Sequence, residues 1–220
     1  MGDGRFWRQM DIVPAEKLKR PITVIGCGGI GSPTTLALAK LGCEDITVID
    51  PDIVELHNVP NQIFGVEDIG RLKVESLHEL VRRLAGTTIK TLVATVGETP
   101  MKLRGIVISG VDSMASRKSI WDLVKFNVQV PLYIDARMGG EVCRIFTLNP
   151  ARISQVEKYE KTLYTDEEAA PEKCTARAVI YNVFSIAGLI GNLVKKFAMG
   201  ESLPFEIILD HVNMALINRE

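Results

Sequence analysis

The sequence contains no cysteine pair at the spacing that binds zinc. Its four cysteines, Cys27, Cys43, Cys143 and Cys174, form no C-x-x-C motif. Neither a zinc ribbon nor a thioredoxin-like redox motif is therefore present, and no structural zinc is expected. A chain of 220 residues does not need a disulfide framework to fold. The cysteines are expected to be reduced thiols of a cytoplasmic protein.

The chain also lacks an excess of charge of either sign. Its 26 basic and 27 acidic residues give a net charge of −1, which offers no electrostatic attraction to nucleic acid or to an anionic membrane. The polar segment 1–10 has no apolar stretch of the kind found in secretory signals. Neither nucleic acid nor a membrane is therefore expected as a partner.

Long apolar stretches are scarce, and residues 176–198 are the one candidate for a membrane span. Asn182 and Asn192 interrupt this stretch. Its apolar residues lie three or four positions apart: Val179, Val183, Ile186, Ile190, Val194 and Phe197. This spacing predicts one buried stripe along a helix. The stretch is therefore interpreted as a core helix and not as a membrane span.

The sequence does contain a regular alternation of short apolar runs and helical segments. Strands are predicted at 22–25, 46–49, 89–96, 105–109, 132–135 and 141–148, and helices at 34–41, 73–84 and 115–126. A closing pair of strands is predicted at 205–209 and 214–217. The pattern predicts an α/β fold with a doubly wound, mostly parallel, Rossmann-like sheet and antiparallel C-terminal strands. One domain, residues 1–220, is expected, with the polar, aperiodic segment of about 149–174 as a crossover loop.

A glycine-rich turn separates the first predicted strand from the first helix. Gly26, Gly28 and Gly31 form a G-x-G-x-x-G motif, and Ser32 with the proline after it is predicted to cap and begin the helix. Such glycines allow the backbone to approach phosphates, and the helix N-terminus supplies N–H donors. Asp50 ends the next strand, where a carboxylate can accept hydrogen bonds from a ribose. These features predict a bound nucleotide but do not distinguish ATP from NAD.

Further segments resemble the ThiF/MoeB/HesA adenylyltransferases, which share their fold with ubiquitin-activating enzymes. The similar segments are Arg5–Gln9 (RFWRQ), Gly26–Ser32 (GCGGIGS), Asp50–Asn58 (DPDIVELHN), Gly70–Ser76 (GRLKVES), Asp112–Arg117 (DSMASR) and Pro171–Thr175 (PEKCT). Their order and spacing extend over roughly residues 5–200, which is far more specific than the glycine motif alone. The stretch Asp135–Gly139, together with Tyr159, is also similar to small stand-alone ThiF-type proteins of bacteria and phages.

The resemblance implies an enzyme that uses ATP and Mg²⁺ to adenylate the C-terminal carboxylate of a ubiquitin-like or sulfur-carrier protein. It implies that the nucleotide is bound by Gly26, Gly28, Gly29, Gly31, Asp50, Asp52, Asn58, Gln62 and Lys73. Lys73 would neutralise phosphate charge, and Asp112 would bind Mg²⁺ together with nucleotide oxygens. Arg8 would enter the site from the other subunit of a homodimer.

Each of these roles has a structural alternative. Lys73 at a helix start is otherwise a solvated charge, Asp112 is otherwise the N-cap of the following helix, and Arg8 is otherwise a surface residue. Cys174 precedes the long helix, whose N–H dipoles lower a thiol pKa. The resemblance implies that Cys174 can form a thioester or an acyl-disulfide with the activated partner. Its alternative is a small buried apolar side chain.

The sequence departs from the family pattern at two positions in the expected site. Asn61 stands in place of an arginine, and Ser113 stands in place of an asparagine. The paired zinc-binding cysteines of many members are also absent. Two other functions therefore stay open. One is a binding protein that has kept the fold without catalysis, and the other is an NAD-dependent oxidoreductase, which would give Lys73, Asp112 and Arg8 no role.

Overall fold

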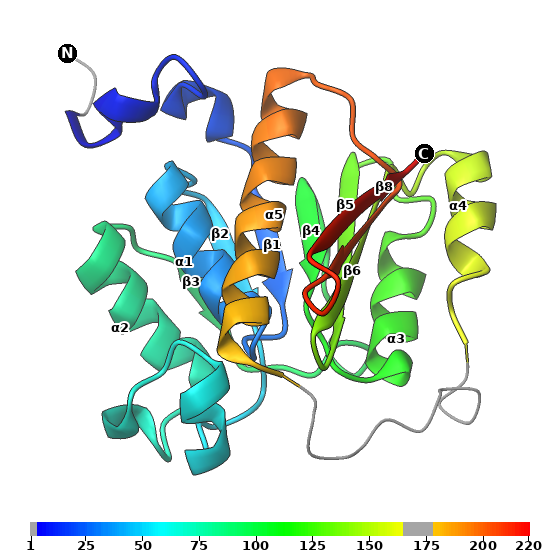
Figure 1. Ribbon diagram of the computed structural model, residues 1–220. Coiled ribbons are helices and arrows are strands. Elements are labelled where there is room, and N and C mark those ends of the chain that lie inside the picture. Colours follow the sequence, from blue (N-terminus) through cyan, green and yellow to red (C-terminus); the bar gives the residue numbers. More distant parts are fainter. Residues whose placement is uncertain (1–3, 165–177) are drawn as a thin grey trace.

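An eight-stranded sheet runs through the molecule in the order β3-β2-β1-β4-β5-β6-β7-β8. Figure 1 shows the computed structural model, which describes residues 4–164 and 178–220. The strands are β1 (Ile22–Ile25), β2 (Ile46–Ile49), β3 (Lys90–Leu92), β4 (Ile106–Ser109), β5 (Leu132–Gly139), β6 (Val142–Leu148), β7 (Glu206–Asp210) and β8 (Ala215–Arg219). Strands β1 to β5 pair in parallel, whereas β6, β7 and β8 pair antiparallel.

The predicted fold class is therefore confirmed, including the antiparallel C-terminal strands. The first two strands share the sequence ITVI, and β4 has the sequence IVIS. Three of the four residues in each ITVI strand and all four in β4 are buried. Short β-branched runs of this kind form central parallel strands because both faces of such a sheet are covered.

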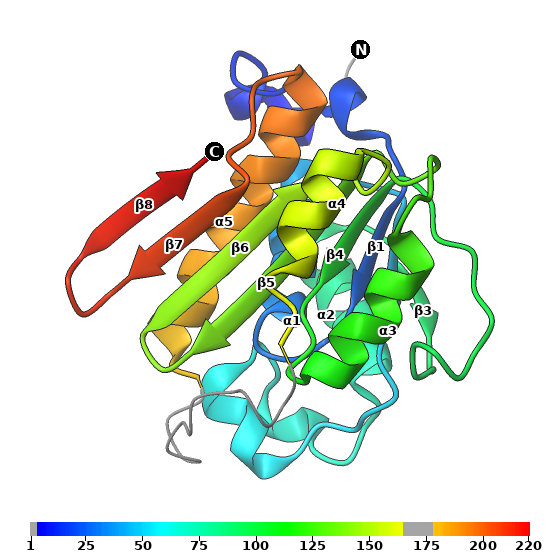
Figure 2. The same cartoon turned by 90° about the vertical axis from the view of Figure 1, so that its right-hand side faces the viewer.

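In the described ranges, five α-helices cover the two faces of the sheet. They are α1 (Gly31–Leu41), α2 (Lys73–Ala85), α3 (Met114–Val124), α4 (Ile153–Glu160) and α5 (Ile180–Met199). Figure 2 shows α3 and α4 in front of the sheet, with α1, α2 and α5 behind it. The predicted stripe of α5 is buried at Val183, Ile186, Ile190 and Val194, which confirms a core helix. No helix in the described ranges is long and apolar enough to cross a membrane.

Three local expectations differ from the structure. A strand was expected at 89–96, but β3 spans only Lys90–Leu92. Residues 149–164 were expected to be loop but contain α4, whose only buried side chains are Val156 and Tyr159. Two buried positions in eight residues give too little periodicity to identify a helix. Ser32 was expected to cap α1, but it lies inside the first turn, and its Oγ donates to the Gly28 carbonyl at 2.8 Å.

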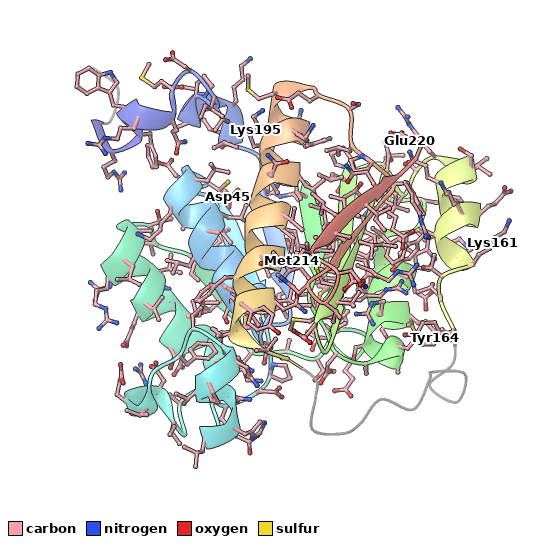
Figure 3. The ribbon with its side chains drawn as sticks, in the orientation of Figure 1. Asp45, Lys161, Tyr164, Lys195, Met214 and Glu220 are labelled. Carbon is pink, nitrogen blue, oxygen red and sulfur yellow. The ribbon has the colours of Figure 1, made fainter. Side chains whose placement is uncertain are left out.

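The C-terminal hairpin extends the sheet away from the helices. Figure 3 labels Met214 at the turn between β7 and β8, where this side chain is exposed, and Glu220 at the end of β8. Strand β8 is the sheet edge, so it pairs only with β7. The same figure places Tyr164, which ends the first described range, beside α3 and at the same end of the molecule as the carboxyl ends of the parallel strands. The candidate site is at this edge of the sheet.

Candidate functional site

The glycine turn lies where the strand order of the sheet reverses, between β1 and β4. The chain leaves β1 toward β2 on one side, and β4 lies on the other side. Gly26 N donates to Ile49 O at 2.9 Å, and Gly110 N donates to Ile25 O at 2.8 Å. These two bonds hold the ends of three strands together. Doubly wound folds bind their ligands in the crevice outside the carboxyl ends of the strands at such a reversal.

Glycine is required at two positions of this turn. Gly26 has φ +90°, and a Cβ there would lie 2.8 Å from the carbonyl oxygen of Gly110. A Cβ on Gly31 would lie 1.7 Å from the carbonyl oxygen of Gly26, so α1 packs directly on the turn. These approaches leave backbone N–H groups at the N-terminus of α1, which is where phosphates bind in such folds.

Asp50 supports the turn from the end of β2. Its Oδ2 accepts a hydrogen bond from Cys27 N at 2.6 Å, and its Oδ1 accepts one from Asp52 N at 2.8 Å. Burial raises the pKa of the Asp50 carboxyl, while these two N–H groups and the Lys73 ammonium oppose the rise. A carboxylate has about four acceptor sites, so Asp50 retains sites for ribose hydroxyls while it holds the turn.

Lys73 is buried, in contrast to the solvated lysine considered from the sequence. It is the first residue of α2, and its Nζ lies 2.8 Å from Asp52 Oδ2. The Lys73 side chain is 10% exposed, whereas that of Asp52 is 61% exposed. The charge of Lys73 also acts on the pKa of both Cys27 and Asp50. The ammonium therefore lies close to the glycine turn, where it can neutralise phosphate charge.

The segment from Asn58 to Gln62 packs against the same turn. Asn58 is buried, and its Oδ1 accepts a hydrogen bond from Glu55 N at 2.9 Å. Gln62 Nε2 lies 3.8 Å from the position of a Cβ on Gly28. Gln62 Oε1 is buried and has no hydrogen-bond partner in the described part of the chain. Buried amides are normally paired, so an unpaired one beside the glycines favours contact with a ligand.

Asn61 also lies beside the glycine turn. Its carbonyl oxygen is 3.1 Å from the position of a Cβ on Gly29. The departure from the family arginine is therefore at the site itself. A neutral side chain here supplies less positive charge to a triphosphate than an arginine would.

Asp112 is exposed at the carboxyl edge of the sheet, immediately before α3. It is not the N-cap of that helix, so this alternative was wrong. The N-cap is Ser113, whose Oγ accepts a hydrogen bond from Ser116 N at 3.0 Å. Serine and asparagine are equally good N-caps, which explains how Ser113 replaces the family asparagine. The Asp112 carboxylate is therefore not used to cap α3.

No preformed metal site accompanies Asp112. Within residues 4–164 and 178–220, no group of three or more His, Cys, Asp or Glu side chains could hold a metal ion. The exposed carboxylate of Asp112 is a group of the kind that binds Mg²⁺, because Mg²⁺ commonly binds one or two carboxylates plus substrate phosphates.

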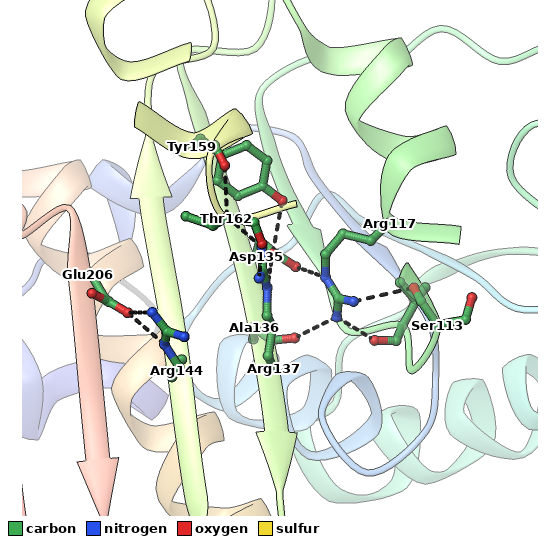
Figure 4. A network of polar contacts seen from close by, with 10 residues as sticks. Ser113, Arg117, Asp135, Ala136, Arg137, Arg144, Tyr159, Thr162 and Glu206 are labelled. Carbon is green, nitrogen blue, oxygen red and sulfur yellow. Dashed lines mark hydrogen bonds and ion pairs between the residues drawn. The ribbon is translucent and has the colours of Figure 1, made fainter. Parts of the chain in front are cut away.

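Sequence reasoning did not identify the buried network shown in Figure 4, in which Arg117 binds the backbone on both sides of Asp112. Asp135, at the end of the parallel part of the sheet, has no exposed surface. It accepts hydrogen bonds from Arg117 Nε at 2.7 Å, Arg137 Nε at 2.8 Å and Tyr159 Oη at 2.9 Å. Burial lowers the pKa of Arg117, but the charge of Asp135 and its hydrogen bond to Arg117, together with smaller contributions from Tyr133 and Tyr159, raise it overall. The sequence signals were the family resemblance of Asp112–Arg117 and the resemblance of 135–139 and Tyr159 to small family members.

Arg8 lies far from the glycine turn of its own chain. It is exposed in the 3-10 helix η1 (Gly4–Gln9), and Gln9 Nε2 donates to Leu41 O at 2.6 Å, at the C-terminal end of α1. The glycine turn is at the other end of this 11-residue helix, about 16 Å away at 1.5 Å per residue. Figure 1 shows η1 and the turn at opposite ends of α1. The structure therefore does not bring Arg8 to the site within one chain.

The three described cysteines are structural. Cys27, Cys43 and Cys143 are buried and free. Burial raises the pKa of Cys27 well above its ordinary value, that of Cys43 to about 12, and that of Cys143 to about 11. These thiols are poor nucleophiles at neutral pH. Cys174 lies outside the described residues.

Comparison with known proteins agrees with the family resemblance noted in the sequence. A model of the ThiF family matches residues 9–214. The adenylyltransferase and sulfurtransferase MOCS3 of Arabidopsis thaliana is 33% identical over 130 residues, which cover 56% of this chain and 28% of that protein. The sulfur carrier protein ThiS adenylyltransferase of Escherichia coli K12 is 27% identical over 187 residues, which cover 79% of this chain and 69% of that protein.

A solved structure shows the same fold. The crystal structure of E. coli MccB with ATP superposes on this chain with a TM-score of 0.73, at 19% sequence identity. The match covers 100% of this chain and 72% of that one. At this identity the likeness establishes the architecture, and the chemistry has to be argued from the site.

Proposed function

This chain belongs to the ThiF family, and from that premise we propose that residues 1–220 form an adenylyltransferase domain. The substrate is ATP, and the acceptor is the C-terminal carboxylate of a ubiquitin-like or sulfur-carrier protein. A carboxylate oxygen attacks the α-phosphorus of ATP, the bond to the bridging oxygen breaks, and pyrophosphate leaves with the electron pair. The names of the two relatives support this class of reaction.

The observation that carries the proposal is the position of Lys73. The Lys73 ammonium is buried beside the glycine turn and paired with a largely exposed Asp52. Its attraction for phosphates is therefore little screened by water. An NAD-dependent oxidoreductase would not need it there. Adenylation needs such a charge because the triphosphate must be held and its leaving group neutralised.

Asp112 is proposed to bind Mg²⁺ together with phosphate oxygens. The metal would neutralise charge on the leaving pyrophosphate. Asp112 suits this role because it is exposed at the carboxyl edge, while Ser113 caps the helix in its place. The loop that carries Asp112 begins at Gly110, which contacts Gly26.

Arg8 is proposed to act in the site of a second copy of the chain. The observation in support is that η1 is attached at the far end of α1, so Arg8 cannot serve its own glycine turn. A homodimer that places η1 of one subunit beside the turn of the other would supply the guanidinium. Positive charge on a transferring phosphoryl group is a large catalytic effect.

Cys174 is proposed to accept the acyl group in a second step. Its thiolate would attack the acyl carbon of the adenylate, and AMP would leave with the electron pair of the broken bond. This step rests on the family resemblance of 171–175. The raised pKa values of the other thiols make it easy to test, because they should not compete.

Asn61 is the observation that favours a second candidate, a binding protein without catalysis. It removes a family arginine at a position that contacts Gly29. ATP binding without pyrophosphate exchange would identify this second function.

The test is ATP–pyrophosphate exchange in the presence of candidate carrier proteins encoded near this chain. We expect exchange in the wild type, its loss in Asp112→Ala, and its retention in Asp122→Ala, which removes an exposed aspartate of α3. Mixed Arg8→Ala and Asp112→Ala chains should recover part of the activity, because one of the two sites then has both residues. If the wild type binds NAD and not ATP, the proposal is wrong.

A further inference from the structure

Arg117 connects the buried Asp135 to the loop that carries Asp112. We propose that Asp135, acting through Arg117, is a positioning residue that fixes Asp112 for the reaction. This role in the reaction rests on the proposed function, whereas the hydrogen bonds of Arg117 to the loop are seen in the structure. Asp135 has no exposed surface, and Arg117 is 3% exposed, so neither side chain touches a substrate.

The guanidinium of Arg117 binds the backbone on both sides of Asp112. Nη2 donates to Val111 O at 2.7 Å, and Nη1 donates to Ser113 O at 3.3 Å. Nε donates to Asp135 Oδ1 at 2.7 Å. A guanidinium is planar, with donors in fixed directions. Its Nε bond to Asp135 therefore decides where the other two nitrogens point, and so where the backbone around Asp112 lies.

Asp135 is itself held rigidly from the opposite side. Arg137 Nε binds Asp135 Oδ2, and its terminal nitrogens donate to Thr162 O at 2.8 Å and Thr162 Oγ1 at 2.9 Å. Tyr159 Oη donates to the same Oδ2 at 2.9 Å. Figure 4 shows these contacts converging on one carboxylate. The carboxylate cannot rotate to follow Arg117, so Arg117 and the loop must follow it.

The position of the network favours a role beyond stability. A buried ion pair is weak evidence for stability, because desolvation can exceed the attraction between the charges. This pair lies where the parallel pairing of β4 with β5 ends, next to the Gly110–Ser113 loop whose first residue contacts Gly26. Groups that support a metal ligand in this way typically change metal affinity or activity by about 10- to 100-fold when they are altered.

Three variants separate positioning from stability. Arg117→Lys keeps the charge but lacks the fork that binds Val111 O and Ser113 O together. Asp135→Asn keeps the shape and removes the charge. Tyr159→Phe is the matched control, because it removes one hydrogen bond from the same carboxylate while Arg137, which also binds Oδ2, continues to hold that carboxylate in place. All three are expected to lower the melting temperature.

Two measurements follow at a temperature where every variant is folded. The first is the Mg²⁺ concentration that gives half-maximal pyrophosphate exchange. It should rise about 10- to 100-fold in Arg117→Lys and Asp135→Asn and stay at the wild-type value in Tyr159→Phe. The second is amide hydrogen exchange of residues 110–116, which should accelerate in the first two variants and not in the control.

Each outcome decides the proposal. Unchanged amide exchange of the loop in Arg117→Lys overturns it, and so does a faster loop with an unchanged Mg²⁺ requirement. An equal rise in the Mg²⁺ requirement in Tyr159→Phe would show that the network acts only through stability, which also overturns it. If Asp135→Asn does not fold, Arg117→Lys and Tyr159→Phe decide. If the wild type shows no exchange activity, the proposed function fails, and loop amide exchange alone decides whether Arg117 holds the loop.

Discussion

Replacing Gly31 by alanine should damage both the fold and the nucleotide site. A Cβ at this position would lie 1.7 Å from the carbonyl oxygen of Gly26 and 3.2 Å from Val24 Cγ1. Real Cβ contacts are not shorter than 3.0 Å, so the first turn of α1 must move away from the glycine turn. The obstacle is a backbone carbonyl, which cannot rotate away as a flexible side chain would.

The size of the effect follows from this displacement. Overpacking costs about 1–3 kcal/mol, and a backbone obstacle places Gly31→Ala near the upper value. For a chain of this length, about 3 kcal/mol lowers the melting temperature by roughly 6–12 °C. The N–H groups of the turn would move with the helix and lose hydrogen bonds to the phosphates. A hydrogen bond to a charged group is worth about 1.5–3 kcal/mol, so affinity for ATP should fall by roughly 10- to 100-fold.

The assay combines scanning calorimetry without nucleotide and titration calorimetry with Mg²⁺ and ATP. Gly188→Ala is the matched control, since Gly188 is exposed in α5 and a Cβ there has no atom within 4 Å. Alanine is a better helix former than glycine by about 0.5–1 kcal/mol. The control should therefore raise the melting temperature slightly and leave ATP binding unchanged.

Two results would refute this reasoning. One is a Gly31→Ala protein with the melting temperature and ATP affinity of the wild type, which would mean that α1 does not pack on the turn as described. The other is a loss of stability without a loss of ATP affinity at a temperature where the variant is folded. That outcome would place the nucleotide away from the glycine turn.

Three further predictions follow from single side chains. Lys73→Met should reduce ATP affinity by roughly tenfold or more, with little loss of stability, because its partner Asp52 is largely exposed; titration calorimetry and urea unfolding measure the two effects. Ser113→Ala should cost about 1 kcal/mol of stability through the lost N-cap, whereas Ser113→Asn should unfold at the wild-type urea concentration. Burial raises the pKa of Cys43 to about 12, so the native state keeps a proton that the unfolded state releases. The free energy of unfolding should therefore fall as the pH rises above about 9, and less steeply in Cys43→Ala; equal slopes would contradict the assignment.

The nucleophilic role proposed for Cys174 predicts that this thiol is reactive in the native protein. Native protein treated with iodoacetamide near neutral pH should be labelled at Cys174 before Cys27, Cys43 or Cys143, which are buried. Mass spectrometry identifies the labelled cysteines. Native protein that stays unlabelled at Cys174 would contradict a reactive thiol there.

The sequence by itself determined the layered fold and the place of the glycine turn. The repeated ITVI runs predict buried parallel strands because β-branched residues suit a sheet covered on both faces. The G-x-G-x-x-G motif between such a strand and a helix requires a close backbone approach, and Gly26 and Gly31 make that approach. These are short-range properties, fixed by residues next to one another in the chain.

Tertiary structure alone decided which side chains meet at the site. Lys73 is buried beside Asp52, and Arg117 and Tyr159 both bind Asp135. Arg8 lies far from its own glycine turn. Each of these relations is between residues that are far apart in the sequence. Such contacts depend on strand order and on which face each helix covers. Neither hydrophobic periodicity nor local propensity contains that information, because both describe a residue's neighbours along the chain and not across the sheet.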